Sequence, residues 1–83
     1  MNLQLINGQF SPQDALDILT QLTHVKLNYH ERQIKAADTE EDVKSRETRI
    51  KTLQRSLQEA RQVMAENGQR AVILQADIFL TIV

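Results

Sequence analysis

The sequence predicts a small α+β protein, mostly α, in which an antiparallel two-helix hairpin is flanked by N- and C-terminal β-strands. Three observations support this prediction: two long segments repeat apolar residues at helical spacing, a helix-start pattern introduces each of them, and both chain ends carry strand-like apolar patterns. The expected elements are a strand at 2–10, helices at 12–36 and 40–67, and a strand at 71–83. The strands are expected to pair with each other or across an oligomer interface.

Length and composition limit the possible classes of protein. The 83 residues allow one small domain, 1–83, which is marginally stable alone. The absence of cysteine excludes disulfides and thiolate metal sites and fits a reducing compartment. A net charge of −1 gives no global field toward nucleic acid or anionic membrane. Neither a signal-peptide pattern nor an apolar run of about 18 residues is present, so a cytoplasmic location without membrane contact is expected.

The first strand contains a dipeptide typical of hairpin turns, but too few residues follow it to form a second strand. Apolar residues at Leu3, Leu5, Ile6 and Phe10 indicate a short strand, and Asn7-Gly8 is a strong two-residue hairpin pattern when strands flank it. Ser11-Pro12 follows too soon for a returning strand. A bulge or bend within one strand is an equal alternative.

The first helix begins with a capping pattern. Ser11 can accept hydrogen bonds from free N–H groups of the first turn, Pro12 loses no hydrogen bond at the first helical position, and Asp14 complements the positive helix end. The apolar positions then cover roughly half the circumference, which is wide for a helix with one neighbour. We therefore expect contact with a sheet or a second subunit as well. The stripe comprises Ala15, Ile18, Leu22, Val25 and Tyr29, broadened by Leu16, Leu19, Leu27 and Ile34.

The second helix follows a turn of about four residues, which predicts that the two helices lie antiparallel. Thr39 and Asp42 form the capping pattern, with Asp38 as a rival cap. Asn67-Gly68 predicts the stop, with Gly68 in the left-handed conformation. A narrow seam typical of coiled coils runs along this helix at Val43, Arg46, Ile50, Leu53, Leu57, Ala60, Met64 and Asn67.

The C-terminal segment alternates apolar residues as a strand does, from Val72 to Ile82. Antiparallel helices bring both strands to the same end of the hairpin, so these strands should pair antiparallel. The last strand is longer than the first can cover, and its remaining edge would be satisfied by another copy of the chain. A homodimer or higher oligomer is therefore expected. The candidate interface residues are Leu22, Lys26, Tyr29, His30, Leu74, Ile78, Phe79, Leu80 and Ile82.

No arrangement of residues points to catalysis or to a metal. His24 and His30 are six residues apart, on different helix faces, and no paired-histidine zinc motif is present. Lys26 and His30 fall within the apolar stripe, where interface or helix-edge contacts are a more common role than base chemistry. We expect a protein that is not an enzyme and that uses no cofactor or metal.

A local group of basic residues gives the alternative function. The second helix carries Lys44, Arg46, Arg49, Lys51 and Arg55 against Glu47 alone in that span, and such a group can contact phosphates. A solvated charged face is the commoner meaning, and no aromatic residues interleave for base stacking. The predicted function is therefore a structural or protein-interaction module that forms a homo-oligomer, as an adaptor or a small subunit of a larger complex. The alternative is a small regulatory nucleic-acid-binding protein.

Overall fold

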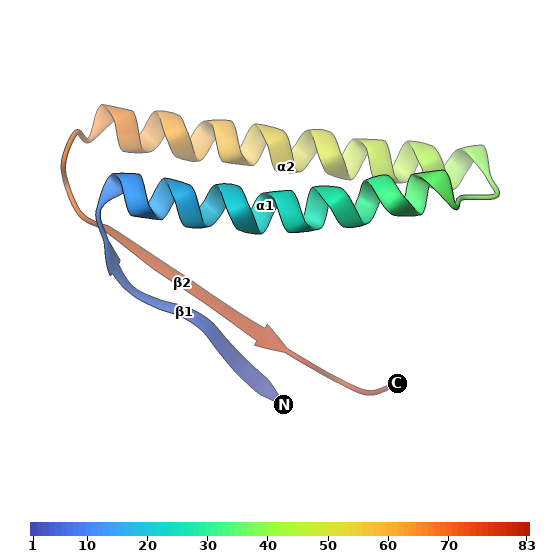
Figure 1. Cartoon of the computed structure of the whole chain (residues 1–83), viewed down its shortest axis with the longest axis horizontal. Helices are drawn as coiled ribbons and strands as arrows, with labels where there is room; N and C mark the ends of the chain where they lie inside the picture. The colour runs from blue at the N-terminus through green and yellow to red at the C-terminus, as the bar shows by residue number, and fades with distance from the viewer.

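The computed structural model describes all residues, 1–83, and confirms the α+β class with helix predominating. The order is β1 (Asn2–Phe10), α1 (Pro12–Lys35), α2 (Glu40–Glu66) and β2 (Val72–Phe79). The two helices lie side by side as a hairpin, and the two strands form a ribbon that leaves the open end of this hairpin (Figure 1). The helices end within one residue of the expected positions, whereas β2 ends at Phe79 instead of residue 83.

The helix boundaries follow from local capping chemistry. The Ser11 hydroxyl accepts a hydrogen bond from the Asp14 N–H at 3.1 Å, and the Thr39 hydroxyl accepts one from the Asp42 N–H at 3.2 Å. Both bonds satisfy first-turn donors that have no partner within the helix. Thr39, not Asp38, is thus the cap of α2. Gly68, just beyond α2, has φ of +62°, the left-handed conformation that the sequence predicts.

The helical hairpin is held by one stripe from each helix. On α2, every residue of the expected seam except Asn67 is partly buried. On α1, the stripe that packs against this seam is not centred where the sequence analysis placed it. It is polar in part, and its members, here called the inner stripe, are Leu16, Leu19, Thr23, Leu27, His30 and Ile34, all partly or fully buried.

The sheet is a two-stranded antiparallel ribbon in which β1 covers β2 along its whole length. Phe10 pairs with Val72 at one end and Asn2 with Phe79 at the other. Met1 and Leu80 then exchange two further backbone hydrogen bonds, at 2.8 and 3.2 Å. The expectation that β2 extends past its partner is therefore wrong. The unpaired edges are instead the outer edges of both strands.

A bulge lies within β1 between Gln4 and Ile6, and not at the Asn7-Gly8 dipeptide. Ile6 is three positions after Leu3, so a regular strand would point their side chains to opposite faces. The extra residue at Leu5 restores both to the same face, because Leu3 pairs with Ile78 and Ile6 pairs with Ala76. The resulting apolar sheet face comprises Leu3, Ile6, Phe10, Val72, Leu74, Ala76 and Ile78.

The ribbon does not cover the helices. It diverges from α1 as it leaves the hairpin (Figure 1), and α1 makes few contacts with either strand. The molecule is flat, with extents of 46, 31 and 13 Å, and its radius of gyration of 15.4 Å exceeds the roughly 12 Å of a compact chain of this length. Only Ala15 and His30 are buried. A single chain therefore has almost no hydrophobic core.

The left-handed conformation of Gly68 predicts a ranked effect of substitution. Gly68→Ala should lower the free energy of unfolding by about 1 kcal/mol, because a Cβ disfavours positive φ. Gly68→Asn should cost roughly half as much, since asparagine tolerates this region best among residues with side chains. Nothing lies within 4 Å of an added Cβ, so crowding cannot cause a loss. Urea unfolding followed by circular dichroism at one protein concentration measures the order; equal values for all three proteins would contradict it.

Candidate interaction surface

One apolar stripe of α1 does not pack against α2 and is largely exposed. This outer stripe comprises Ile18, Leu22, Val25 and Tyr29 and lies on a different side of the helix from the inner stripe, by roughly 120° at 3.6 residues per turn. Leu22 is 38% exposed, Tyr29 46% and Val25 69%. The apolar half-circumference of α1 is thus divided between one stripe that packs on α2 and one that faces solvent.

The apolar sheet face is also incompletely covered. Leu3 and Ile78, which pair across the ribbon, are both nearly half exposed. On the opposite face, where Asn2, Gln4 and Asp77 lie, Phe79 and Ile73 are about three-quarters exposed. Beyond β2, Leu80 and Ile82 are exposed as well. A two-stranded ribbon with one apolar face needs another layer to bury that face.

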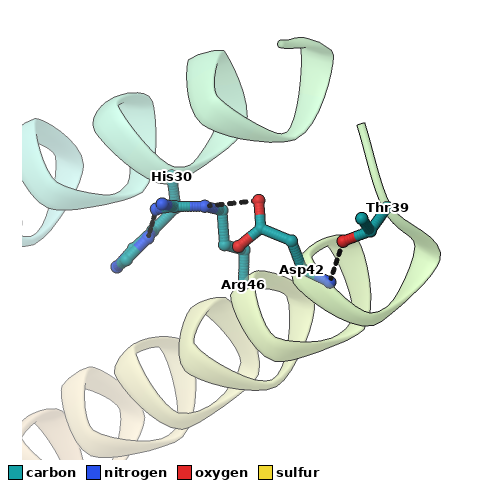
Figure 2. A network of polar contacts seen from close by, with 4 residues as sticks. All are labelled: His30, Thr39, Asp42 and Arg46. Carbon is teal, nitrogen blue, oxygen red and sulfur yellow. Dashed lines mark hydrogen bonds and ion pairs between the residues drawn. The ribbon is translucent and has the colours of Figure 1, made fainter. Parts of the chain in front are cut away.

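A polar cluster joins the helices near the closed end of the hairpin (Figure 2). The Arg46 side chain reaches from α2 between the helices. Its Nη1 donates to His30 Nδ1 at 3.2 Å and its Nε donates to the Asp42 carboxylate at 3.5 Å. Its guanidinium carbon lies 5.7 Å from the centre of the Tyr29 ring. Arg46 therefore connects a buried group, His30, to the exposed edge of the outer stripe at Tyr29.

This geometry fixes the protonation of His30. Arginine offers only donors, so His30 Nδ1 must accept, and the ring is neutral with its proton on Nε2. That Nε2 is buried and has no hydrogen-bond partner. Burial lowers the pKa of His30 below its ordinary value of 6.5, and the positive charges of Arg46, Arg49 and Lys26 lower this pKa further.

The expected interface residues divide among several surfaces. Leu22 and Tyr29 belong to the outer stripe, Leu74 and Ile78 to the apolar sheet face, and Phe79 to the opposite sheet face. Leu80 and Ile82 lie beyond β2. Lys26 is exposed between the two stripes of α1, whereas His30 is 2% exposed and packs against α2. His30 thus lies against α2 and Lys26 does not, which corrects the interpretation that the two residues share one stripe.

The basic residues of α2 also divide. Lys44, Lys51 and Arg55 lie within about 40° of one another on the face of α2 that is turned away from α1. Arg49 is exposed on a flank, and Arg46 is occupied between the helices. Lys44 forms an ion pair with Glu40 at 3.6 Å. The five residues thus form one cluster of three, with Arg49 and Arg46 apart from it.

The sequence analysis did not predict the burial of His30 or its contact with Arg46, although both residues stand in partial sequence patterns. Arg46 occupies a seam position in α2, between Val43 and Ile50, although its charge alone favours a surface role. His30 lies three residues after Leu27 and four before Ile34, which is the spacing of the inner stripe. A polar residue at such a position on each helix is the pattern that could have indicated a cross-helix pair.

Comparison with known proteins gives no match: no protein-family model, no curated protein sequence and no solved structure matches the chain. The chain contains no group of three or more histidine, aspartate or glutamate side chains placed to hold a metal ion. Neither helix has an apolar stretch sufficient to cross a membrane. The function must therefore be inferred from the surfaces described above.

The lowered pKa of His30 predicts a pH dependence of stability. In the unfolded chain His30 binds a proton more readily than in the folded one, so stability rises with pH between the two pKa values. The free energy of unfolding should be highest above about pH 6.5 and should fall as the pH drops below 6.5. Urea unfolding between pH 7.5 and 5 measures this decrease.

The matched variants for this measurement are His30→Gln and His24→Gln. Glutamine at position 30 can still accept a hydrogen bond from Arg46 but does not titrate. The free energy of unfolding of His30→Gln should therefore fall less than that of the wild type as the pH drops. His24 is exposed, so the free energy of unfolding of His24→Gln should fall with pH as much as that of the wild type. Equal slopes for the wild type and His30→Gln would contradict the assignment.

Proposed function

We propose that this chain is a structural or protein-interaction module that forms a homo-oligomer and acts as an adaptor or a small subunit of a larger complex. The observation that supports the proposal is surface area. The chain exposes 6792 Å² for a mass of 9.5 kDa, whereas a compact folded monomer of this mass exposes about 5,000 Å². The exposed surface includes apolar side chains of the outer stripe, such as Val25, and of the apolar sheet face, such as Leu3 and Ile78.

The size of the excess fits an obligate dimer. About 1,700 Å² in excess per chain corresponds to roughly 3,500 Å² for a pair of chains, and obligate homodimers bury about 2,000–5,000 Å². A chain with two buried residues has little else to stabilise it. Folding and association would then be one event, as expected for dimers without a stable folded monomer. A cytoplasmic location is consistent with this module, because proteins in a reducing compartment are not stabilised by disulfides and the chain has no cysteine.

A second function, contact with nucleic acid, has one observation in its favour. Lys44, Lys51 and Arg55 lie on one exposed face of α2, on the side away from the outer stripe, and would remain free in an oligomer built on α1. Three cations along about three helical turns match the spacing of backbone phosphates only in part. One of these cations, Lys44, is also neutralised by its ion pair with Glu40. The self-association module is therefore the leading proposal.

Self-association predicts a concentration-dependent mass. In sedimentation equilibrium at micromolar concentration, the wild type should have about twice the 9.5 kDa of one chain or more. Leu22→Glu places a charge in the outer stripe and should weaken association by at least about 10-fold, because a carboxylate is costly to bury. Gln62→Glu adds the same charge on the exposed face of α2 that is turned away from α1, and it should leave association unchanged. A folded wild type that stays at 9.5 kDa would overturn the proposal.

The alternative function predicts binding that weakens with salt. If the basic face contacts phosphates, a fluorescently labelled DNA or RNA duplex should bind at low salt and dissociate as salt is raised. Replacing Lys44, Lys51 and Arg55 together with glutamine should abolish that binding, whereas replacing Arg61 and Arg70, which lie elsewhere, should not. Absence of binding at about 50 mM salt would exclude this alternative.

A further inference from the structure

The charges of α1 are distributed unevenly along its length. Its first half carries Asp14 and Asp17 without a cation, and its second half carries Lys26, Arg32 and Lys35 against Glu31. The halves therefore have net charges of −2 and +2. The ion pairs of the chain are Glu40–Lys44 and Asp42–Arg46, both within α2, so Asp14 and Arg32 have no ionic partner.

These charges lie beside the outer stripe. Asp14 and Arg32 are both exposed, and at 3.6 residues per turn both project from the same flank of α1, next to Val25. The outer stripe itself advances by alternating steps of four and three residues, from Ile18 to Leu22, Val25 and Tyr29. This is the spacing by which one helix packs along another.

Only one direction of pairing brings opposite charges together when the second helix is another α1. In a parallel pair, the acidic first turn of one α1 would meet the same acidic turn of the other. In an antiparallel pair related by a two-fold axis, Ile18 lies opposite the partner's Tyr29, and Leu22 opposite the partner's Val25. A two-fold axis keeps each flank on the same side, so Asp14 comes within about one residue, or ~1.5 Å along the axis, of the level of the partner's Arg32.

We propose that two copies of the chain associate through antiparallel contact of their α1 outer stripes, with Asp14 of each copy paired to the partner's Arg32. This inference rests on the proposed function and adds to it the surface, the direction and the register. The two-fold axis passes between Leu22 and Val25, so each dimer contains the Asp14–Arg32 pair twice. Antiparallel alignment also opposes the two helix dipoles favourably.

The test is a charge-reversal cycle measured by sedimentation equilibrium. Asp14→Arg alone and Arg32→Asp alone should each weaken self-association by roughly 10-fold, because each replaces two attractions per dimer by two repulsions. The double variant should recover wild-type affinity to within roughly 3-fold, since it exchanges the two charges. Any general harm that Asp14→Arg does to the first turn persists in the double variant, so recovery isolates the contact.

Matched controls apply the same changes in charge elsewhere. Glu31→Arg changes the charge as Asp14→Arg does, but at an exposed site off the outer stripe, and Lys51→Asp does the same for Arg32→Asp on the outer face of α2. Both controls should leave affinity near the wild-type value. Association that persists while the single reversals equal their controls, or while the double variant fails to recover, would overturn the register but leave the proposed function. A monomeric wild type would overturn both.

Disulfide trapping gives a second readout that does not depend on charge. The chain has no cysteine, so Ile18→Cys and Tyr29→Cys chains can be mixed in a glutathione buffer. The antiparallel register predicts mixed Cys–Cys pairs in excess of the one-half expected at random. Like positions would be separated by roughly 16 Å along the axis, beyond the ~7 Å limit between the Cα atoms of a disulfide. A majority of like-with-like disulfides would indicate parallel helices and overturn the proposal.

Discussion

The whole structure depends on a mismatch within α1, which has two apolar stripes and only one neighbouring helix. The inner stripe packs on α2, and the outer stripe remains exposed because the β-ribbon diverges from the helix (Figure 1). A helix that is apolar over half its circumference needs two partners, and the chain supplies one. Its small core, large surface and flat shape all follow from this mismatch. Self-association through α1 would supply the second partner.

The polar cluster gives the helical hairpin a register that apolar contacts alone define weakly. A guanidinium donates in a fixed planar geometry, so Arg46 can satisfy His30 and Asp42 together only when the helices stand at one relative height (Figure 2). Sliding by one turn would leave a buried histidine and an inward arginine unpaired, which costs more than losing interchangeable apolar contacts. The unsatisfied Nε2 of His30 shows that this specificity is obtained at some expense in stability.

The parts of the fold that depend on local chemistry could be predicted from the sequence. Ser11, Thr39 and Gly68 act through hydrogen bonds and backbone angles within a few residues, and the seam of α2 is a single narrow stripe. The strand pairing followed from the antiparallel helices. A bulge within the first strand was one of two alternatives that the sequence left open, but its position at Leu5 was not predicted, nor was the burial of His30. Each is decided by a partner distant in sequence. For the same reason, half-circumference periodicity in α1 could not show which stripe would meet α2. Of the outer stripe, only Leu22 and Tyr29 were among the expected interface residues.

The joining of the two chain ends has a consequence for the order of folding. The hydrogen bond between Met1 and Leu80 spans 79 positions, and every pair in the ribbon joins residues that are far apart along the chain. Closing such loops is entropically slow, whereas the helical hairpin is closed by a turn of about four residues. Once the hairpin exists, Phe10 and Val72 are already neighbours, and strand pairing can proceed residue by residue from this pair toward Asn2 and Phe79. The helices thus serve as the template on which the sheet is assembled.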